Sequence, residues 1–192
     1  MQKYAFIVVL VLQGISFTSK AADFVLDGGL HFGGDTLAIV YKNQSGNQQE
    51  IKAGQLVSVA VGARFDVSES LEMPVTFGIK FDAASFDDYY GNKVDVTFIR
   101  YPVNALLLYK AEKWRLGGGL TYHLNPEFKV KGGYYDYSKK FKDALGYLLE
   151  VRYFFSDNAY VGSRYTHIEY EVKSSSQTVD GTSVGVVLGA NL

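Results

Sequence analysis

The side chains that could do chemistry are mainly charged residues placed at every second position of otherwise apolar segments. In the segment 145–153, Glu150 and Arg152 alternate with Val151 and Tyr153. A period of two is typical of a β-strand, whose successive side chains point to opposite faces. Eight charged residues placed in this way form a candidate network: Asp27, Arg64, Lys80, Arg100, Arg115, Glu150, Arg152 and Arg164.

These charges share one face of their strands, and an unpaired charge in a confined space is costly. The order of the strands along the chain predicts that Asp27 pairs with Arg64. It also places Glu150 between Arg115 and Arg164, as the acidic centre of a mostly basic layer. Two interpretations remain open: the charges line a selective pore, or they form a plug of ion pairs and hydrogen bonds.

A hydrolytic site would need a nucleophile beside a base, with an acid to orient that base. The histidines of the chain are His31, His123 and His167, each toward the same end of its strand. Ser163 lies near His167 in sequence, but no acid accompanies the two. We therefore expect the histidines to be hydrogen-bonding residues at a rim, and we predict no catalytic residue.

The segment 127–142 is predicted to be an irregular loop rich in lysine and aromatic residues. Such a loop could bind anionic sugars or phosphates, or it could be an ordinary solvated loop. Its candidate binding residues are Lys129, Lys131, Tyr134, Tyr135, Tyr137, Lys139 and Lys140.

Metal, cofactor and nucleic-acid sites are not indicated. Asp82, Asp87 and Asp88 lack the further oxygen ligands of a dedicated Ca²⁺ site, and we predict neither a metal nor a cofactor. The chain has no cysteine, hence no disulfide and no thiol chemistry. Its formal net charge of −1 argues against nucleic acid as a partner.

The charges are positioned by eight segments that alternate with a period of two. Within 114–125, Trp114 and Leu120 alternate with Arg115 and Gly117. Glycine on a water-facing strand position weakens the strand and packs nothing, so this face lines a narrow interior while the bulky face meets lipid. The predicted strands lie at 24–33, 56–66, 75–82, 99–109, 114–125, 144–153, 161–167 and 183–192.

The connections between these segments differ in length. Short turns are predicted at 68–74, 110–113 and 156–158, and longer loops at 35–52, 87–93, 127–142 and 173–177, the first of which contains a hairpin. Pro102 lies inside a strand and predicts a bulge or break there, because proline lacks a ladder donor. Together these features predict an all-β fold, an eight-stranded antiparallel up-and-down transmembrane β-barrel.

The first 21 residues have the features of a secretory signal peptide. Lys3 is followed by the apolar run 5–12 and by the small-x-small sequence Ser19-Lys20-Ala21. The run is much shorter than the ~20 residues that span a bilayer. We therefore expect a signal peptide at 1–21 and a barrel domain at 22–192.

The whole pattern resembles the small eight-stranded outer-membrane barrels of Gram-negative bacteria, the group of OmpX, OmpW, the OmpA transmembrane domain and the PagL-like enzymes. The resemblance covers nearly all of 22–192 and lies in the strand pattern. It implies a monomer in the cell outer membrane, in contact with outer-membrane lipid and lipopolysaccharide, and inserted by the barrel assembly machinery. Ser183, Gly185, Leu188 and Ala190 loosely fit the terminal signal of the group, although the last residue is Leu192 and not aromatic.

The resemblance leaves the activity open. PagL-like enzymes use a His-x-Ser motif, and the matching position here reads His123-Leu124-Asn125, without the serine. We predict a structural or surface-interacting protein with a charge-paired interior. The alternatives are a narrow porin-like channel for small solutes, a lipid A-modifying hydrolase, and a soluble periplasmic barrel whose apolar set faces inward.

Overall fold

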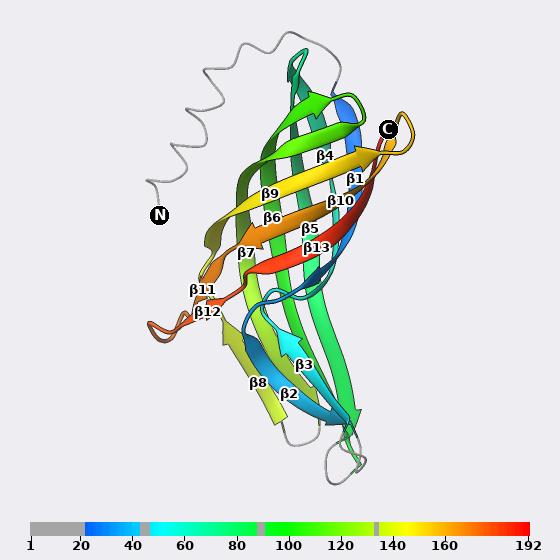
Figure 1. The fold of residues 1–192 in the computed structure, drawn as a ribbon. Helices are drawn as coiled ribbons and strands as arrows, with labels where there is room; N and C mark the ends of the chain where they lie inside the picture. Colours follow the sequence, from blue (N-terminus) through cyan, green and yellow to red (C-terminus); the bar gives the residue numbers. More distant parts are fainter. Residues whose placement is uncertain (1–21, 43–46, 88–90, 133–134) are drawn as a thin grey trace.

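The structure is a computed structural model and describes residues 22–42, 47–87, 91–132 and 135–192. The expected signal peptide at 1–21 lies outside the described residues. Eight strands form the barrel: β1 (Asp23–Phe32), β4 (Leu56–Ser68), β5 (Leu71–Asp87), β6 (Lys93–Ala111), β7 (Trp114–Gly132), β9 (Ala144–Phe154), β10 (Ala159–His167) and β13 (Ser183–Asn191). Each is antiparallel to its neighbours in the order β6-β5-β4-β1-β13-β10-β9-β7, and pairing of β6 with β7 closes the ring (Figure 1). The predicted fold class is confirmed.

The outward face of the barrel is apolar and the inward face is polar. Leu120 is 58% exposed and Leu149 56% exposed, whereas Arg100 and Arg152 are completely buried. A closed barrel leaves no unpaired edge, which lipid requires because it offers no water to a free backbone group. The alternative of a soluble barrel, which needs the apolar set inside, is therefore wrong. No helix among the described residues is long and apolar enough to cross a membrane.

One end of the barrel carries the short turns, and we call it the short-turn end. Its turns join β4 to β5, β6 to β7 and β9 to β10, and Phe24 and Leu192 exchange two backbone hydrogen bonds there. The turn predicted at 68–74 is too long, because β5 already begins at Leu71. Pro74 fits inside this strand because the ladder to β6 is interrupted between the pairs Glu72–Leu108 and Val75–Ala105.

The opposite, long-loop end continues as ordered β-structure (Figure 1). Besides the β5–β6 hairpin, which extends to Asp87 and Lys93, the described residues form three further hairpins here: β2 (Thr36–Lys42) with β3 (Asn47–Lys52), the end of β7 with β8 (Tyr135–Lys140), and β11 (Glu169–Glu171) with β12 (Thr178–Asp180). The hairpin within 35–52 was predicted; its tip at 43–46 lies outside the described residues. The prediction of an irregular loop at 127–142 is wrong, because β7 and β8 continue the strand structure there. The high lysine content hid their alternation in the sequence.

An apolar cluster lies under these hairpins, and we call it the cap. It draws side chains from β3, β5, β6, β7, β9 and β11 and from residues beside them. Phe98 packs edge-on against both Phe141 and Tyr170, with ring centroids 5.6 Å apart in each pair. The cap consists of Ile51, Ala53, Ala84, Val96, Phe98, Phe128, Phe141, Ala144, Ile168, Tyr170 and Val172.

Irregularities in β6 and β7 separate the barrel wall from the cap. The register between them shifts between Ile99 and Tyr101, next to Pro102, as the proline predicted. On β7, Asn125 has φ of 46° and is exposed, so its predicted inward orientation is wrong. Its backbone N–H donates to Asp143 Oδ1 at 2.8 Å. β7 thus contains one extra residue at this point, which interrupts the alternation of its side chains. As a result, the side chain of Phe128 points into the cap.

Candidate functional site

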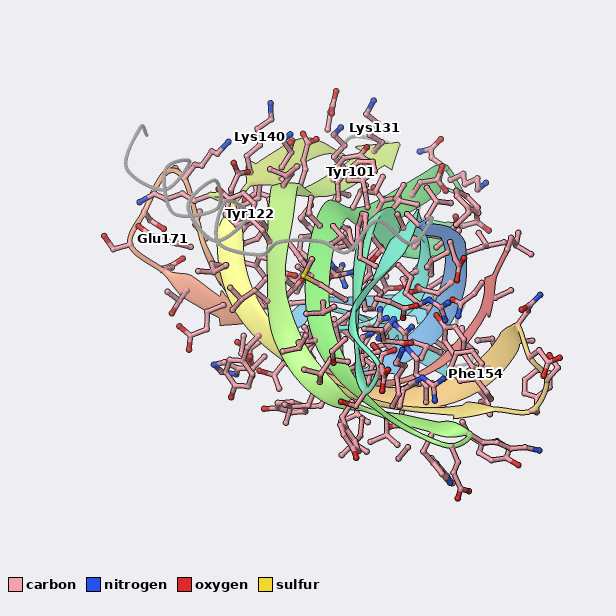
Figure 2. All side chains as sticks on the ribbon, turned by 90° about the horizontal axis from the view of Figure 1, so that it is seen from above. Tyr101, Tyr122, Lys131, Lys140, Phe154 and Glu171 are labelled. Atoms are coloured by element: carbon pink, nitrogen blue, oxygen red, sulfur yellow. The ribbon has the colours of Figure 1, made fainter. Side chains whose placement is uncertain are left out.

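The barrel interior contains two groups of paired charges, and Figure 2 shows nitrogen and oxygen atoms gathered inside the ring of strands. The first group lies at the short-turn end. Arg64 pairs with Asp23, and its Nη1 lies 3.6 Å from Glu72 Oε2. Arg115 Nε donates to the same Glu72 oxygen at 3.2 Å. Two arginines therefore meet two carboxylates.

The second group lies near mid-barrel. Glu150 accepts from Arg152 and, at 2.5 Å, from Arg164 Nε. Arg164 Nη2 also donates to Asp27 Oδ2 at 3.3 Å. The Arg152 guanidinium lies 4.4 Å from the centre of the Tyr160 ring. In this group too, two arginines pair with two carboxylates, so the buried charges neutralise one another locally.

The predicted partners are partly wrong. Asp27 pairs with Arg164 instead of Arg64, and Glu150 pairs with Arg152 in place of Arg115. Register explains both: Arg64 lies opposite Asp23, which is four residues, or two periods of the alternation, before Asp27. Arg115 lies opposite Arg152 on the adjacent strand and reaches toward the short-turn end instead. Glu150 is nevertheless the acid between two arginines.

Glu72 and Asp23 were missed as interior residues. Glu72 is completely buried and joins Arg64 to Arg115. The signal was present, because Glu72 continues the alternation of Thr76 and Lys80 backward along β5. The prediction of a turn at 68–74 concealed it.

The interior is not polar throughout. Leu106, Leu108 and Leu148 are buried against one another beside the glycines of β7, with Leu106 opposite Gly119 and Leu108 opposite Gly117. A Cβ on either glycine would collide with a β6 carbonyl oxygen, that of Ala105 or Leu107. The glycines therefore permit close strand approach, and leucines from neighbouring strands fill the space. The run Leu106-Leu107-Leu108 hid this alternation in the sequence.

Above mid-barrel, Lys80 and Arg100 lie opposite each other on β5 and β6. Lys80 Nζ donates to Ser183 Oγ at 3.1 Å, and Arg100 Nη2 donates to the carbonyl oxygen of Gln55 at 2.5 Å. The Arg100 guanidinium lies 4.4 Å from the centre of the Phe98 ring, at the base of the cap. Neither cation has a carboxylate of a described residue within ion-pairing distance.

A cavity of about 20 Å³ lies beside Lys80. A cavity needs roughly 10–15 Å³ to hold one water molecule, so this cavity has room for one water molecule or for an ion of similar size. Its polar lining comes from six of the strands: His31, Ser58, Lys80, Asn104, Thr121, His123, Arg164 and Thr166.

Two of the histidines, His31 and His123, line this cavity and are not at the rim. His31 Nε2 is hydrogen-bonded to Ser58 Oγ at 2.7 Å, and His123 Nδ1 to the Tyr170 hydroxyl at 2.7 Å; both histidines are buried in the interior. His167 Nδ1 is bonded to Thr182 Oγ1 at 2.9 Å. It lies four residues from Ser163 along one strand, a spacing of roughly 13 Å, too far for a nucleophile and its base.

Most of the predicted lysine-rich site is described, and its positive charge is largely compensated. Lys129 Nζ lies 2.8 Å from Glu127 Oε2, and the Lys129 ammonium holds the pKa of Glu127 below its usual range. Lys131 is flanked by Asp95 and Asp136 on the adjacent strands.

The remaining residues of this site are dispersed. Figure 2 shows Lys131 and Lys140 at the outer margin, pointing away from the barrel. Lys139 lies opposite Phe128, and Tyr137 is 53% exposed. Tyr134 and the side chain of Tyr135 lie outside what the structure describes.

No group of three or more metal-ligating side chains occurs among the described residues. Of the three aspartates weighed for Ca²⁺, Asp82 is buried and accepts a hydrogen bond from the Lys52 backbone N–H at 3.2 Å. Asp88 lies outside the described residues.

Comparison with known proteins gives the family. A model of the outer membrane protein β-barrel domain matches residues 7–191. The chain therefore belongs to this family and resides in the outer membrane. Accordingly the short-turn end faces the periplasm and the long-loop end faces the cell exterior.

The solved structures agree on the fold. Neisserial surface protein A is 12% identical with a TM-score of 0.58, over 90% of this chain and 100% of that chain. Ail, the attachment invasion locus protein of Yersinia pestis, solved in complex with the heparin analogue sucrose octasulfate, is 12% identical with a TM-score of 0.51, over 88% and 96% of the respective chains. A search of curated proteins found no match.

Proposed function

We propose that this outer-membrane protein is a closed barrel that does not conduct solutes and presents an ordered extracellular surface for structural or surface-interacting roles. The observation that carries the proposal is that two kinds of packing fill the interior, ion pairs in one part and apolar side chains in another. Ion pairs with neutralised charge occupy mid-barrel and the periplasmic end, and the apolar cap lies across the extracellular end. Eight strands leave an interior just wide enough for side chains.

The extracellular extension supports a surface role. β5, β6 and β7 run beyond the apolar belt, and β8 adds a further strand to the sheet they form. A chain that only needed to seal a barrel would not require ordered hairpins of this length. Because lysines and acids alternate on this surface, we favour contact with lipopolysaccharide and neighbouring surface groups over a face that selects polyanions. Ail, by contrast, was solved with a sulfated sugar analogue.

We also propose that the protein works as a monomer, inserted by the barrel assembly machinery, and that it is not an enzyme. Ring closure through β6 and β7 pairs the edges of all eight barrel strands within one chain, so no second copy is needed to complete the wall. The separation of Ser163 from His167 supports the absence of a hydrolytic dyad.

Two assays test this proposal against its rivals. Proteoliposomes containing the protein should not swell in small sugars or amino acids, and lipid A from cells with and without the gene should have the same mass spectrum. Swelling would favour the channel, and loss of an acyl chain would favour the hydrolase.

An amine-reactive reagent on intact cells should label Lys131; failure to label it would contradict the extracellular position of the β7–β8 hairpin.

A further inference from the structure

The cavity beside Lys80 combines buried positive charge with a lining that contains no acid. None of the described residues that line it is an aspartate or glutamate. Lys80 is 4% exposed, and its one hydrogen-bond partner among the described residues is the Ser183 hydroxyl. An ammonium group carries three N–H donors, so two of them have no protein partner there.

The balance of charge around the cavity is positive. The carboxylates of Asp27 and Glu150 are matched by Arg152 and Arg164. Above them lie two buried cations, Lys80 and Arg100, and one buried acid, Asp82. With Lys80 protonated, two cations less one carboxylate leave one positive charge without a counter-charge in a confined interior, which is costly.

We propose that this cavity binds one small monovalent inorganic anion of the halide class, chloride in the cell. The Lys80 ammonium supplies the charge, and the Thr166 hydroxyl and the Asn104 amide supply further donors in the lining. One N–H of Asn104 donates to Thr76 Oγ1 at 3.2 Å, so the second is available. The volume of about 20 Å³ has room for one ion about the size of a water molecule. This proposal is independent of the surface function proposed above.

The test is thermal unfolding after refolding into detergent micelles in chloride, bromide or gluconate at equal ionic strength. Gluconate is too large for the cavity. The wild-type protein should melt about 5 °C or more higher in the two halides, when these are in roughly hundredfold excess over their Kd. Equal Tm values in halide and gluconate would overturn the proposal.

The variants Lys80→Met and Lys110→Met locate the effect. Lys80→Met removes the charge that attracts the anion, so its Tm should be the same in all three salts. Lys110 Nζ is already paired with Asp66 Oδ1 at 2.9 Å, and Lys110→Met should keep the halide effect. Halide dependence that survives Lys80→Met would refute the site. If Lys80→Met does not fold, crystals of the wild-type protein grown in bromide decide the question by an anomalous peak beside Lys80 Nζ or its absence.

Discussion

At the residue scale, the protein is organised by buried charges, most of which are paired locally. Alternation in the sequence placed Asp27, Glu150 and Arg152 on the inward face, where they are buried, because every second side chain of a strand shares a face. It did not reveal Glu72 or the buried leucines. The partners were not predictable in the same way. Asp27 and Arg64 lie on adjacent strands, but the stagger between these strands places Arg64 opposite Asp23.

Glu150 provides the clearest test of the paired interior. Glu150→Gln removes the charge between Arg152 and Arg164, and the loss of one partner from a buried pair typically costs about 3 kcal/mol or more. We expect a lower free energy of unfolding, measured by urea titration in micelles.

The matched control for this change is Glu127→Gln on the extracellular part of β7. Glu127 pairs with Lys129, but both side chains are partly exposed, so the pair is worth at most ~1 kcal/mol. Equal stability losses for the two variants would mean that the interior charges are not coupled as described.

Gly29 should be intolerant of a methyl group because a ring occupies the space beside it. A Cβ at Gly29 would lie 2.7 Å from His31 Nε2 and 3.0 Å from Ser58 Oγ, the two atoms of a buried hydrogen bond. Gly29→Ala should therefore destabilise the barrel by about 1–3 kcal/mol. At the adjacent Gly28, the nearest atom is Ser58 O at an ordinary 3.6 Å, so Gly28→Ala should be close to neutral. Melting curves of the two variants should separate; overlapping curves would contradict this packing.

At the element scale, each barrel strand is divided into a lipid face and an interior face. This division was predictable, since Leu120 and Leu149 follow the alternation and are exposed. The structure of 127–142 was not. Charged side chains on the outward face of a hairpin resemble those of a solvated loop, and only pairing with β6 and packing of Phe128 into the cap identify it as β-structure.

The lipid face of β7 is tested by Leu120→Arg. An arginine at the bilayer midplane of a barrel costs roughly 2–4 kcal/mol, so the folded fraction in lipid vesicles should fall. Asp157→Arg, in the exposed turn between β9 and β10, is the control and should fold as the wild-type protein does. Equal folded fractions for both variants would mean that Leu120 does not face lipid.

The cap is tested by Phe141→Ala. Phe141 is completely buried against Phe98 and Tyr170, and truncating such a side chain typically costs about 3–5 kcal/mol. Because the cap holds the β7–β8 hairpin, trypsin should cleave near Lys139 and Lys140 faster on intact cells. Tyr137→Ala, at a residue 53% exposed, should leave the cleavage rate unchanged. An unchanged rate for Phe141→Ala would show that the cap does not anchor the hairpin.

At the scale of the whole molecule, ion pairs, leucines and an apolar cap together replace the single hydrophobic core of a soluble domain. The proposed closure of the interior favours a surface protein over a channel. The features on which it depends were not equally predictable from the sequence. The charged layer was predictable from alternation. The cap was not, because its members come from six strands and their neighbours and meet only when the barrel is closed.

The most direct measurement of this closure is the single-channel current of the purified wild-type protein in planar lipid bilayers. If the paired charges and the cap close the interior as proposed, no discrete conductance steps should occur at any voltage that the bilayer withstands. Reproducible steps in the wild-type protein, with a size that scales with salt concentration, would contradict a closed interior.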